Sequence, residues 1–267
     1  MKKLIIFFSA LALISSCAKV ELTGPVQNDQ SNDSEALKGG LPEVLYASVV
    51  DEQNPETRTY MATNKTVQWE PGDAVSFFYG NRQNARYVYN GNYPDKKVEL
   101  KLGEYGTPGA QHNYSRGIYP YDPNITVVTE GDIDKINVTS PAVQTYAPNS
   151  FGRGANLMIA TGDNSAGEML KFRNACGYLV IKLYGNTNVK NIKLSPVSGV
   201  DKISGGATII TDENDIPMVT MSDGASTVVT LDCSNGGAGV ALGADAANAT
   251  EFWFALPPVN FKSGRCI

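Results

Sequence analysis

The sequence predicts an all-β protein built from two β-sandwiches. Apolar and polar residues alternate with a period of two from Val44 onward, most strictly over residues 97–102 (KVELKL). Turn-forming clusters such as Pro71-Gly72-Asp73 and Asn90-Gly91-Asn92 separate the alternating segments. Beyond the N-terminal segment, no stretch sustains the 3.6-residue period of a helix. Many short strands joined by such turns are typical of β-sandwich domains.

Further candidate strands follow along the chain. Trp69 stands at the end of a strand, directly before the turn at Pro71, so we expect its side chain to cap the core. Residues 178–184 are apolar on both faces except at Lys182, which predicts a central strand covered on both sides. The other candidate strands lie at residues 74–79, 85–89, 170–173, 192–194 and 252–256.

A polar, glycine-containing segment at residues 161–167 (TGDNSAG) separates two groups of strands. We therefore place one sandwich at residues 43–164 and a second at residues 165–267. A single continuous barrel is the alternative architecture, because the same alternation of residues is found in barrel strands.

The first sixteen residues predict an export signal. Two lysines are followed by the apolar run Leu4–Ile14, which is too short for a membrane-spanning helix of about 20 residues. The segment Ile14-Ser15-Ser16-Cys17 then resembles a bacterial lipobox, in which the cysteine thiol is lipidated before the chain is cut in front of it. We expect cleavage between Ser16 and Cys17, and a lipid on Cys17. The alternative is an ordinary signal peptide with a chance cysteine at its border.

The mature chain is expected to be mildly acidic and lipid-anchored. Removal of residues 1–16 takes away two of 22 basic side chains, which leaves 20 against 27 acidic ones and a formal charge of −7. This charge argues against nucleic acid or an anionic membrane as a partner. No later segment is long and apolar enough to span a membrane, so the lipid would be the only membrane anchor. The polar residues 17–42 predict a flexible tether.

Cysteines other than Cys17 give a weaker signal. Cys176, Cys233 and Cys266 are an odd number in an oxidising compartment. Cys176 leads into an apolar strand, which predicts a buried free thiol, and a Cys176–Cys233 disulfide is the alternative. No cluster of cysteine and histidine has zinc-site spacing, so we expect no structural metal.

The sequence contains no arrangement of residues that predicts catalysis. His112 is the only histidine, and we expect it to be exposed in a loop; alone it cannot form a two-histidine zinc site. The acidic groups Asp132–Asp134 and Asp212–Asp215 lie in turn-rich segments, where aspartate bonds the backbone. Their alternatives are paired catalytic carboxylates or, for the second group, a weak calcium site. We therefore expect a protein that is not an enzyme and has no cofactor.

Tyrosines are abundant, and two groups of them are close in sequence. Aromatic side chains on a β-sandwich can stack on sugar rings, which suggests a glycan-binding surface. The alternative is that these tyrosines are strand residues packed in or beside the core. The two groups are Tyr87, Tyr89 and Tyr93, and Tyr119 and Tyr121.

Short motifs occur in a fixed order from residue 56 toward the C-terminus. They are Glu56–Thr59 (ETRT) with Val67–Val75 (VQWEPGDAV), Ile118–Tyr121, Asn156–Ala160, Phe172–Leu179 and Phe254–Pro258. Together with the preceding lipobox, this order resembles the fimbrillin-like lipoproteins of the Bacteroidales.

The resemblance implies two tandem transthyretin-like (Ig-like) sandwiches and a role as shaft, tip or anchor subunit of a type V pilus. It also implies that a trypsin-like protease removes an N-terminal strand after an arginine, and that a strand of a neighbouring fimbrial subunit fills the groove. Arg58 is the first arginine after Cys17 and is the candidate cleavage site. The alternative is that Arg58 lies in a strand that is not removed.

The C-terminus departs from the family pattern, because the chain ends at Phe261–Ile267 where relatives continue with further strands. We therefore expect the second sandwich to be incomplete, which puts strand donation by this chain in doubt. The sequence as a whole predicts a non-catalytic lipoprotein of the outer membrane, at the cell surface or in a fimbrium, with the periplasmic face left open. The alternative is a surface lipoprotein that binds a glycan or another host ligand.

Overall fold

The computed structural model of the chain describes residues 40–50, 67–163, 167–197 and 199–258. These residues form nineteen β-strands and two 3₁₀ segments, η1 (Asn235–Gly237) and η2 (Ala246–Asn248), with no α-helix among them. The predicted all-β class is therefore confirmed. Within the same ranges, no helix has the length and apolarity needed to cross a membrane.

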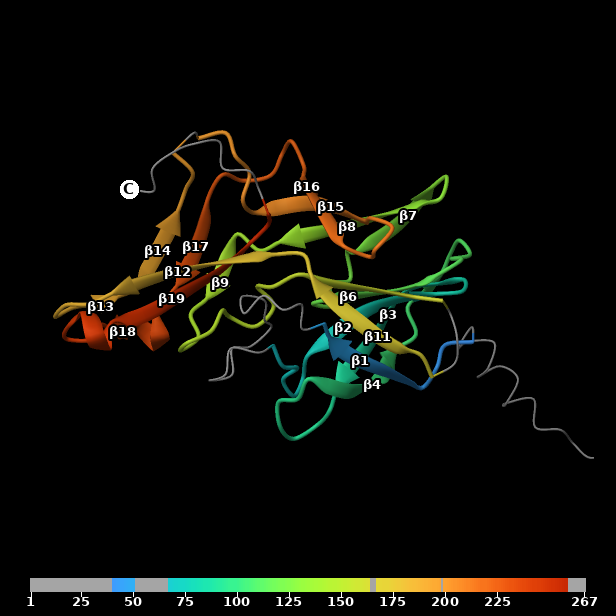
Figure 1. Cartoon of the computed structure of the whole chain (residues 1–267), viewed down its shortest axis with the longest axis horizontal. Coiled ribbons are helices and arrows are strands. Elements are labelled where there is room, and N and C mark those ends of the chain that lie inside the picture. Colours follow the sequence, from blue (N-terminus) through green and yellow to red (C-terminus); the bar gives the residue numbers. More distant parts are fainter. Residues whose placement is uncertain (1–39, 51–66, 164–166, 198, 259–267) are drawn as a thin grey trace, which may run out of the picture.

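Seven strands close into a barrel (Figure 1). Around the ring they are β2 (Ala74–Tyr79), β6 (Ser115–Tyr119), β10 (Met158–Gly162), β11 (Met169–Asn174), β1 (Val44–Val49), β4 (Lys97–Glu104) and β3 (Arg82–Tyr89). β3 pairs in turn with β2, which completes the ring, and the short β5 (Thr107–Pro108) adds to β3. Register shifts in β2 and β3 mark bulges, which bend strands at barrel corners.

The closure of the ring depends on one parallel pair of strands. Each antiparallel step around a ring reverses the strand direction, so a ring of seven strands needs at least one parallel step. β1 and β11 supply it, with Tyr46 opposite Met169 and Val49 opposite Phe172. The other six steps are antiparallel.

Aromatic side chains fill the barrel. Trp69 is fully buried, and its ring meets Tyr119 and Phe172 edge to face, with centroids 5.5 and 5.0 Å apart. The backbone of Trp69 bonds that of Asp95 in both directions, at 2.7 and 3.0 Å, which ties the segment before β2 to the segment before β4. The predicted position of Trp69 in the core is confirmed.

The turn after Trp69 explains why glycine and aspartate follow it. Gly72 has φ +89°, a left-handed conformation that favours glycine. The Asp73 carboxylate accepts the backbone N–H of Glu70 at 2.8 Å and the hydroxyl of Tyr119 at 3.1 Å. Arg153 adds an ion pair to Asp73 at 3.2 Å. The motif therefore stabilises the barrel through a buried polar cluster.

A four-stranded sheet covers one outer side of the barrel. Its order is β16 (Pro217–Met221), β15 (Gly205–Thr211), β8 (Ile133–Ser140) and β7 (Thr126–Glu130). Ile136 and Ile209 of this sheet share a hydrophobic cluster with Phe78, Ile118 and Ile159 of β2, β6 and β10. A second core therefore lies between the barrel and the sheet.

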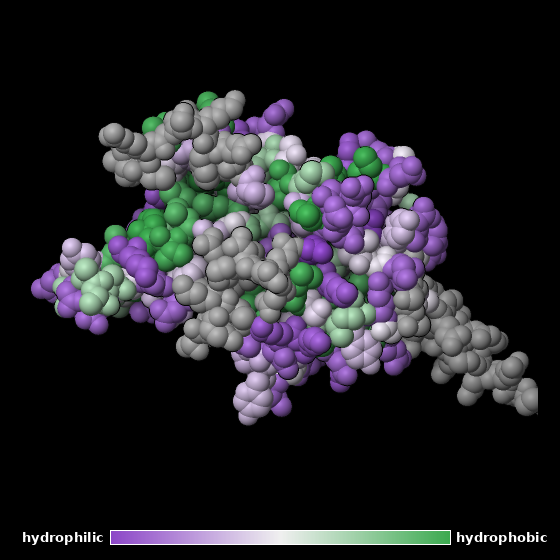
Figure 2. Space-filling view, in the orientation of Figure 1, coloured by the Kyte–Doolittle hydropathy of each residue, from purple (hydrophilic) through white to green (hydrophobic). Residues whose placement is uncertain are grey.

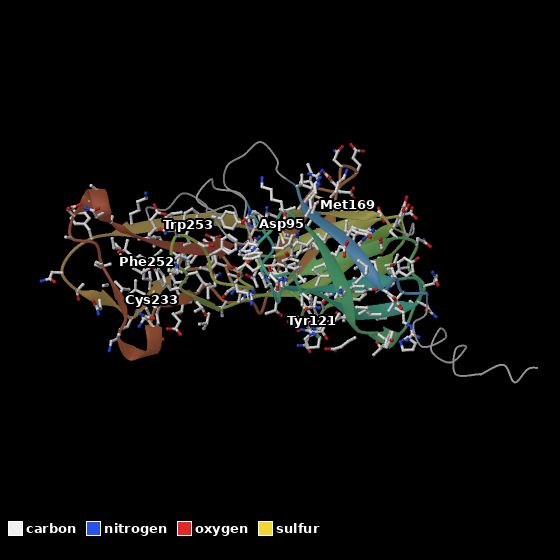
Figure 3. All side chains as sticks on the ribbon, turned by 90° about the horizontal axis from the view of Figure 1, so that it is seen from below. Asp95, Tyr121, Met169, Cys233, Phe252 and Trp253 are labelled. Carbon is white, nitrogen blue, oxygen red and sulfur yellow. The ribbon has the colours of Figure 1, made fainter. Side chains whose placement is uncertain are left out.

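A third core occupies the C-terminal unit. The pair β12 (Gly177–Leu183) and β19 (Thr250–Leu256) lies beside the three strands β14 (Asn191–Leu194), β17 (Val229–Asp232) and β9 (Val143–Thr145), with β13 (Asn188–Val189) and β18 (Val240–Ala241) at its end. Leu231, Cys233, Phe252 and Phe254 are buried together there. Figure 3 shows Cys233 and Phe252 in this unit, away from Met169 on the barrel.

Strand pairing crosses the expected boundary near residue 165. β8 pairs with β15, β9 pairs with β17, and β11 belongs to the barrel. A closed barrel takes the place of the sandwich expected at residues 43–164, but it is not the single continuous barrel that was the alternative, because the later strands form separate sheets. The difference arises because β11, from beyond residue 165, closes the ring with β1.

Trp69→Ala is expected to lower the free energy of unfolding by about 3–5 kcal/mol, because it removes a fully buried ring and leaves a cavity. Urea unfolding followed by circular dichroism measures this change. Tyr93→Ala is the control, because Tyr93 is 79% exposed and its loss should shift stability by less than about 0.5 kcal/mol. Equal losses in both variants would contradict the structural role of Trp69.

Candidate functional site

The candidate site is the seat of β1 in the barrel wall. β1 pairs antiparallel with β4, from Val44 opposite Lys101 to Ser48 opposite Lys97, and parallel with β11 on its other edge. Both edges of β1 are therefore hydrogen-bonded. Removal of this strand would leave the facing edges of β4 and β11 without a partner.

The side chains of β1 alternate between the barrel interior and its outer face, where Tyr46 is exposed and Ser48 is buried. Leu45, Ala47 and Val49 are buried in the barrel core, whereas Tyr46 is 38% exposed. Further backbone bonds extend the pairing past both strand ends, from Leu102 N–H to the Glu43 carbonyl at 3.0 Å and from Val50 N–H to the Phe172 carbonyl at 2.9 Å. β1 is therefore held in the barrel by its backbone and by three inward apolar side chains.

The seat lies on the side of the barrel that the second sheet leaves uncovered. The second core takes barrel side chains from β2, β6 and β10, but none from β1, β4 or β11. Figure 1 shows β1 and β4 on the side away from β8 and β15. The outward Met169 of β11 is 37% exposed beside Tyr46. In the described part of the chain, β1 therefore has no side chain in the core that joins the barrel to the second sheet.

β12 has a strand neighbour on one edge only in the described ranges. Among the described residues, β12 pairs with β19 alone, and its apolar side chains are half-buried. The expected cover on both faces is found, although only in part, whereas the expected neighbour on each edge is not found among the described residues. The two faces of β12 are apolar because each contacts a different core, with Val180 on the second core and Leu179 and Ile181 on the third. Figure 2 shows apolar surface gathered between β14 and β12.

The buried side chain of Gln144 caps the outer edge of β19. Its amide N–H donates to the Ala255 carbonyl at 2.6 Å, and its amide oxygen accepts the Ala255 N–H at 3.0 Å. One side chain thus takes the place of a neighbouring strand at this position. Because β19 is also buried on both faces, with Phe252 on the third core and Trp253 on the second, it is the fixed strand of the pair (Figure 3).

The residues predicted for lipidation and processing lie outside the described part of the chain. They are Ser16 and Cys17 at the expected signal cleavage, Arg58 at the expected protease site, and the late Cys266. By sequence, Arg58 follows β1, so a cut there would separate β1 from the rest of the barrel.

Cys176 and Cys233 are both free and buried. Cys176 belongs to the second core and Cys233 to the third, and no disulfide joins them. Burial raises the pKa of the Cys176 thiol to about 12 and that of Cys233 to about 11. Both thiols are therefore protonated at neutral pH and act as apolar core residues.

His112 is buried, so the prediction of an exposed loop histidine is wrong. Only 3% of the residue is exposed, its ring meets Phe78 edge to face at 5.8 Å, and its Nε2 lies 2.9 Å from the Gln83 side-chain oxygen. The backbone N–H of His112 bonds the Gly80 carbonyl at 2.7 Å, which folds the loop back on the barrel. Burial lowers the pKa of His112, and the charge of Arg116 lowers it further while that of Asp134 opposes this.

One aspartate of each predicted acidic group makes structural contacts. Asp134 forms an ion pair with Arg116 at 2.8 Å between the barrel and the second sheet. Asp212 accepts the backbone N–H groups of Asn214 and Ile216, both at 2.8 Å, as expected for an aspartate in a turn. Within the described ranges, no group of three or more metal-binding side chains occurs.

The tyrosine groups do not form one surface. Tyr87 and Tyr119 are buried inside the barrel. The Tyr89 hydroxyl bonds the Tyr93 carbonyl at 2.7 Å, and the Tyr121 ring packs under the Arg86 guanidinium at 5.4 Å. At least Tyr87 and Tyr119 are therefore core residues. This agrees with the alternative to a glycan-binding surface.

No protein-family model, curated protein or solved structure matches the chain.

The stability of the protein is expected to fall as the pH is lowered through about 6.5, the ordinary pKa of histidine. His112 has a lowered pKa in the fold, so the unfolded chain binds more protons in this range and stability rises with pH. Urea unfolding at several pH values between about 5.5 and 7.5 measures the slope. Because His112 is the only histidine, His112→Gln should flatten it; an unchanged slope would assign the effect to another group.

Proposed function

We propose that this chain is a non-catalytic, lipid-anchored protein of the outer membrane, of the fimbrillin type, that joins fimbrial subunits by exchange of β-strands. The observation that carries the proposal is β1 itself. This strand precedes Arg58 in sequence, closes the barrel through both edges, and lies on the side that the second sheet leaves uncovered. A cut after Arg58 would turn β1 into a separate peptide held only by noncovalent contacts.

Exchange at this seat needs little new structure. An incoming strand would make the same backbone bonds to β4 and β11 that β1 makes, and its alternate side chains would replace Leu45, Ala47 and Val49. Release of β1 breaks the same kinds of contact that binding of a donor strand forms. Which strand occupies the seat therefore depends on the concentrations of the two strands and on how well their side chains fit the barrel core. The donor would come from another subunit.

The protein would exist in two forms, which differ in whether the lipidated Cys17 stays attached to the barrel. With the segment around Arg58 intact, Cys17 holds the barrel at the membrane as an anchor or tip subunit. A cut after Arg58 leaves Cys17 with the released strand, and the barrel can join a polymer at the cell surface. Both residues lie outside the described part of the chain, so this step rests on the sequence motifs.

The division into two transthyretin-like sandwiches belongs to the same proposal. The C-terminal unit, in which a two-stranded sheet lies beside a three-stranded one, supports a sandwich there. In the N-terminal part the closed barrel takes the place of the expected sandwich, and β1 is its exchangeable strand.

Treatment of the purified full chain with an arginine-specific protease, together with a donor subunit, is expected to give polymers that resist SDS without boiling. An excess of a synthetic peptide with residues 43–50 should block them, because it refills the seat of β1. Arg58→Ala should prevent polymer formation, because β1 stays attached. Gel electrophoresis of unboiled samples measures each result.

Two altered peptides test whether the seat of β1 is the site of exchange. The peptide with Ala47→Asp should fail to block, because Ala47 is fully buried and a carboxylate there would be desolvated. The peptide with Tyr46→Asp is the matched control and should still block, because Tyr46 points outward. A cut chain that stays monomeric with every donor, or equal blocking by both peptides, would contradict the proposal.

A further inference from the structure

One end of the barrel contains a cavity of about 140 Å³. Its apolar wall includes Leu45, Phe77 and Leu170, which are all buried in the barrel core. Tyr79 lies at its rim and stacks on Phe77 with ring centroids 5.7 Å apart. The cavity is therefore a preformed apolar pocket at the end where β1, β6 and β11 begin.

Next to the cavity, β6 and β10 place small residues opposite one another. Gly117 faces Ala160 and Ser115 faces Gly162. At Gly117 the free space is taken by Phe172, since a Cβ on this glycine would lie 2.7 Å from the Phe172 Cζ. No aromatic ring fills the corresponding space at Gly162, one step nearer the barrel end.

Two oxygen atoms converge on the space at Gly162 instead. A Cβ added to Gly162 would lie 2.2 Å from Glu168 Oε2 and 2.3 Å from Ser115 Oγ. Both residues also line the cavity. One ligand atom in the cavity can therefore reach the carboxylate and the hydroxyl together.

Ser115 and Glu168 have unused hydrogen-bonding capacity. Ser115 is 1% exposed, and its Oγ has no hydrogen-bond partner in the described part of the chain. A buried hydroxyl without a partner is unfavourable, so a ligand that bonds it gains affinity. The Glu168 carboxylate accepts only the Asp163 N–H among the bonds described, at 3.1 and 3.2 Å to its two oxygens.

The electrostatics of this end of the barrel favour a cation. Burial raises the pKa of Glu168, the negative charge of Asp163 raises it further, and the bond from the Asp163 N–H opposes both. The carboxylate is thus partly desolvated beside a second carboxylate. A positively charged donor would relieve both effects.

We propose that the barrel-end cavity binds a small primary amine with an apolar body. The ammonium group donates to the Glu168 carboxylate and to Ser115 Oγ, and the body lies against Leu45, Phe77 and Leu170. A cavity of about 150 Å³ lined by leucine and phenylalanine holds benzene, so a body of one six-membered ring fits. This inference does not depend on strand exchange.

The test titrates the uncut full chain with benzylamine and with its neutral analogue benzyl alcohol, by calorimetry and by NMR of the backbone amides. Benzylamine should bind one site per chain, with shifts at β6, β10 and β11. Benzyl alcohol should bind roughly tenfold more weakly, because it lacks the charge-assisted bond to Glu168.

Three variants decide the assignment. Glu168→Gln should weaken benzylamine to the level of benzyl alcohol and leave benzyl alcohol unchanged. Gly162→Ala should abolish binding of both probes, whereas Gly177→Ala, with no atom within 4 Å of the added Cβ, should change neither. The unfolding midpoint of each variant shows whether it is folded. If Gly162→Ala does not fold, Glu168→Gln, at a half-buried residue, still tests whether the cavity is the amine site. Absence of saturable benzylamine binding, or full binding by Glu168→Gln, would overturn the proposal.

Discussion

The parallel pairing of β1 with β11 is the constraint on which the rest of the structure depends. A ring of seven strands cannot close with antiparallel steps alone, and this pair provides the exception. It joins residues 44–49 to residues 169–174, so the barrel is complete only when the chain has returned from the second sheet. β1 begins only a few residues after the expected lipid tether. The same pair of strands therefore determines where this tether would meet the folded part.

The three cores divide the barrel into a side that packs on the second sheet, called the fixed side, and a side that the second sheet leaves uncovered. Phe78, Ile118 and Ile159 anchor β2, β6 and β10 to the second sheet, and β19 links that core to the C-terminal unit through Trp253 and Phe252. β1, β4 and β11 contribute to the barrel interior alone. Strand exchange at β1 would therefore disturb one core of three, whereas loss of a strand from the fixed side would disturb two.

The sequence predicted the features that depend on local patterns. The strand over residues 97–102, the burial of Trp69 and the turn role of Asp212 all follow from residue period or turn chemistry. Strand partners could not be predicted, because a period of two fixes which face is buried but not which strand lies alongside. For the same reason, the apolar faces of residues 178–184 indicated a covered central strand, although β12 is a half-exposed strand between two cores.

The seat of β1 and the barrel-end cavity share residues. Ligand binding in the cavity would therefore be energetically coupled to the release of β1. Val44 and Leu45 of β1, with Gly40 and Pro42 before it, form part of the cavity wall, and the Tyr87 hydroxyl bonds the Pro42 carbonyl beside it. A ligand in the cavity therefore binds the barrel that contains β1 more tightly than the barrel that has lost it. By linkage, such a ligand stabilises the β1-containing state by RT ln(1 + [L]/Kd) and opposes strand release by the same free energy. Amine binding would thus favour the membrane-anchored form of the protein. The strength of amine binding can be measured from its effect on the equilibrium of β1 release in the cut chain.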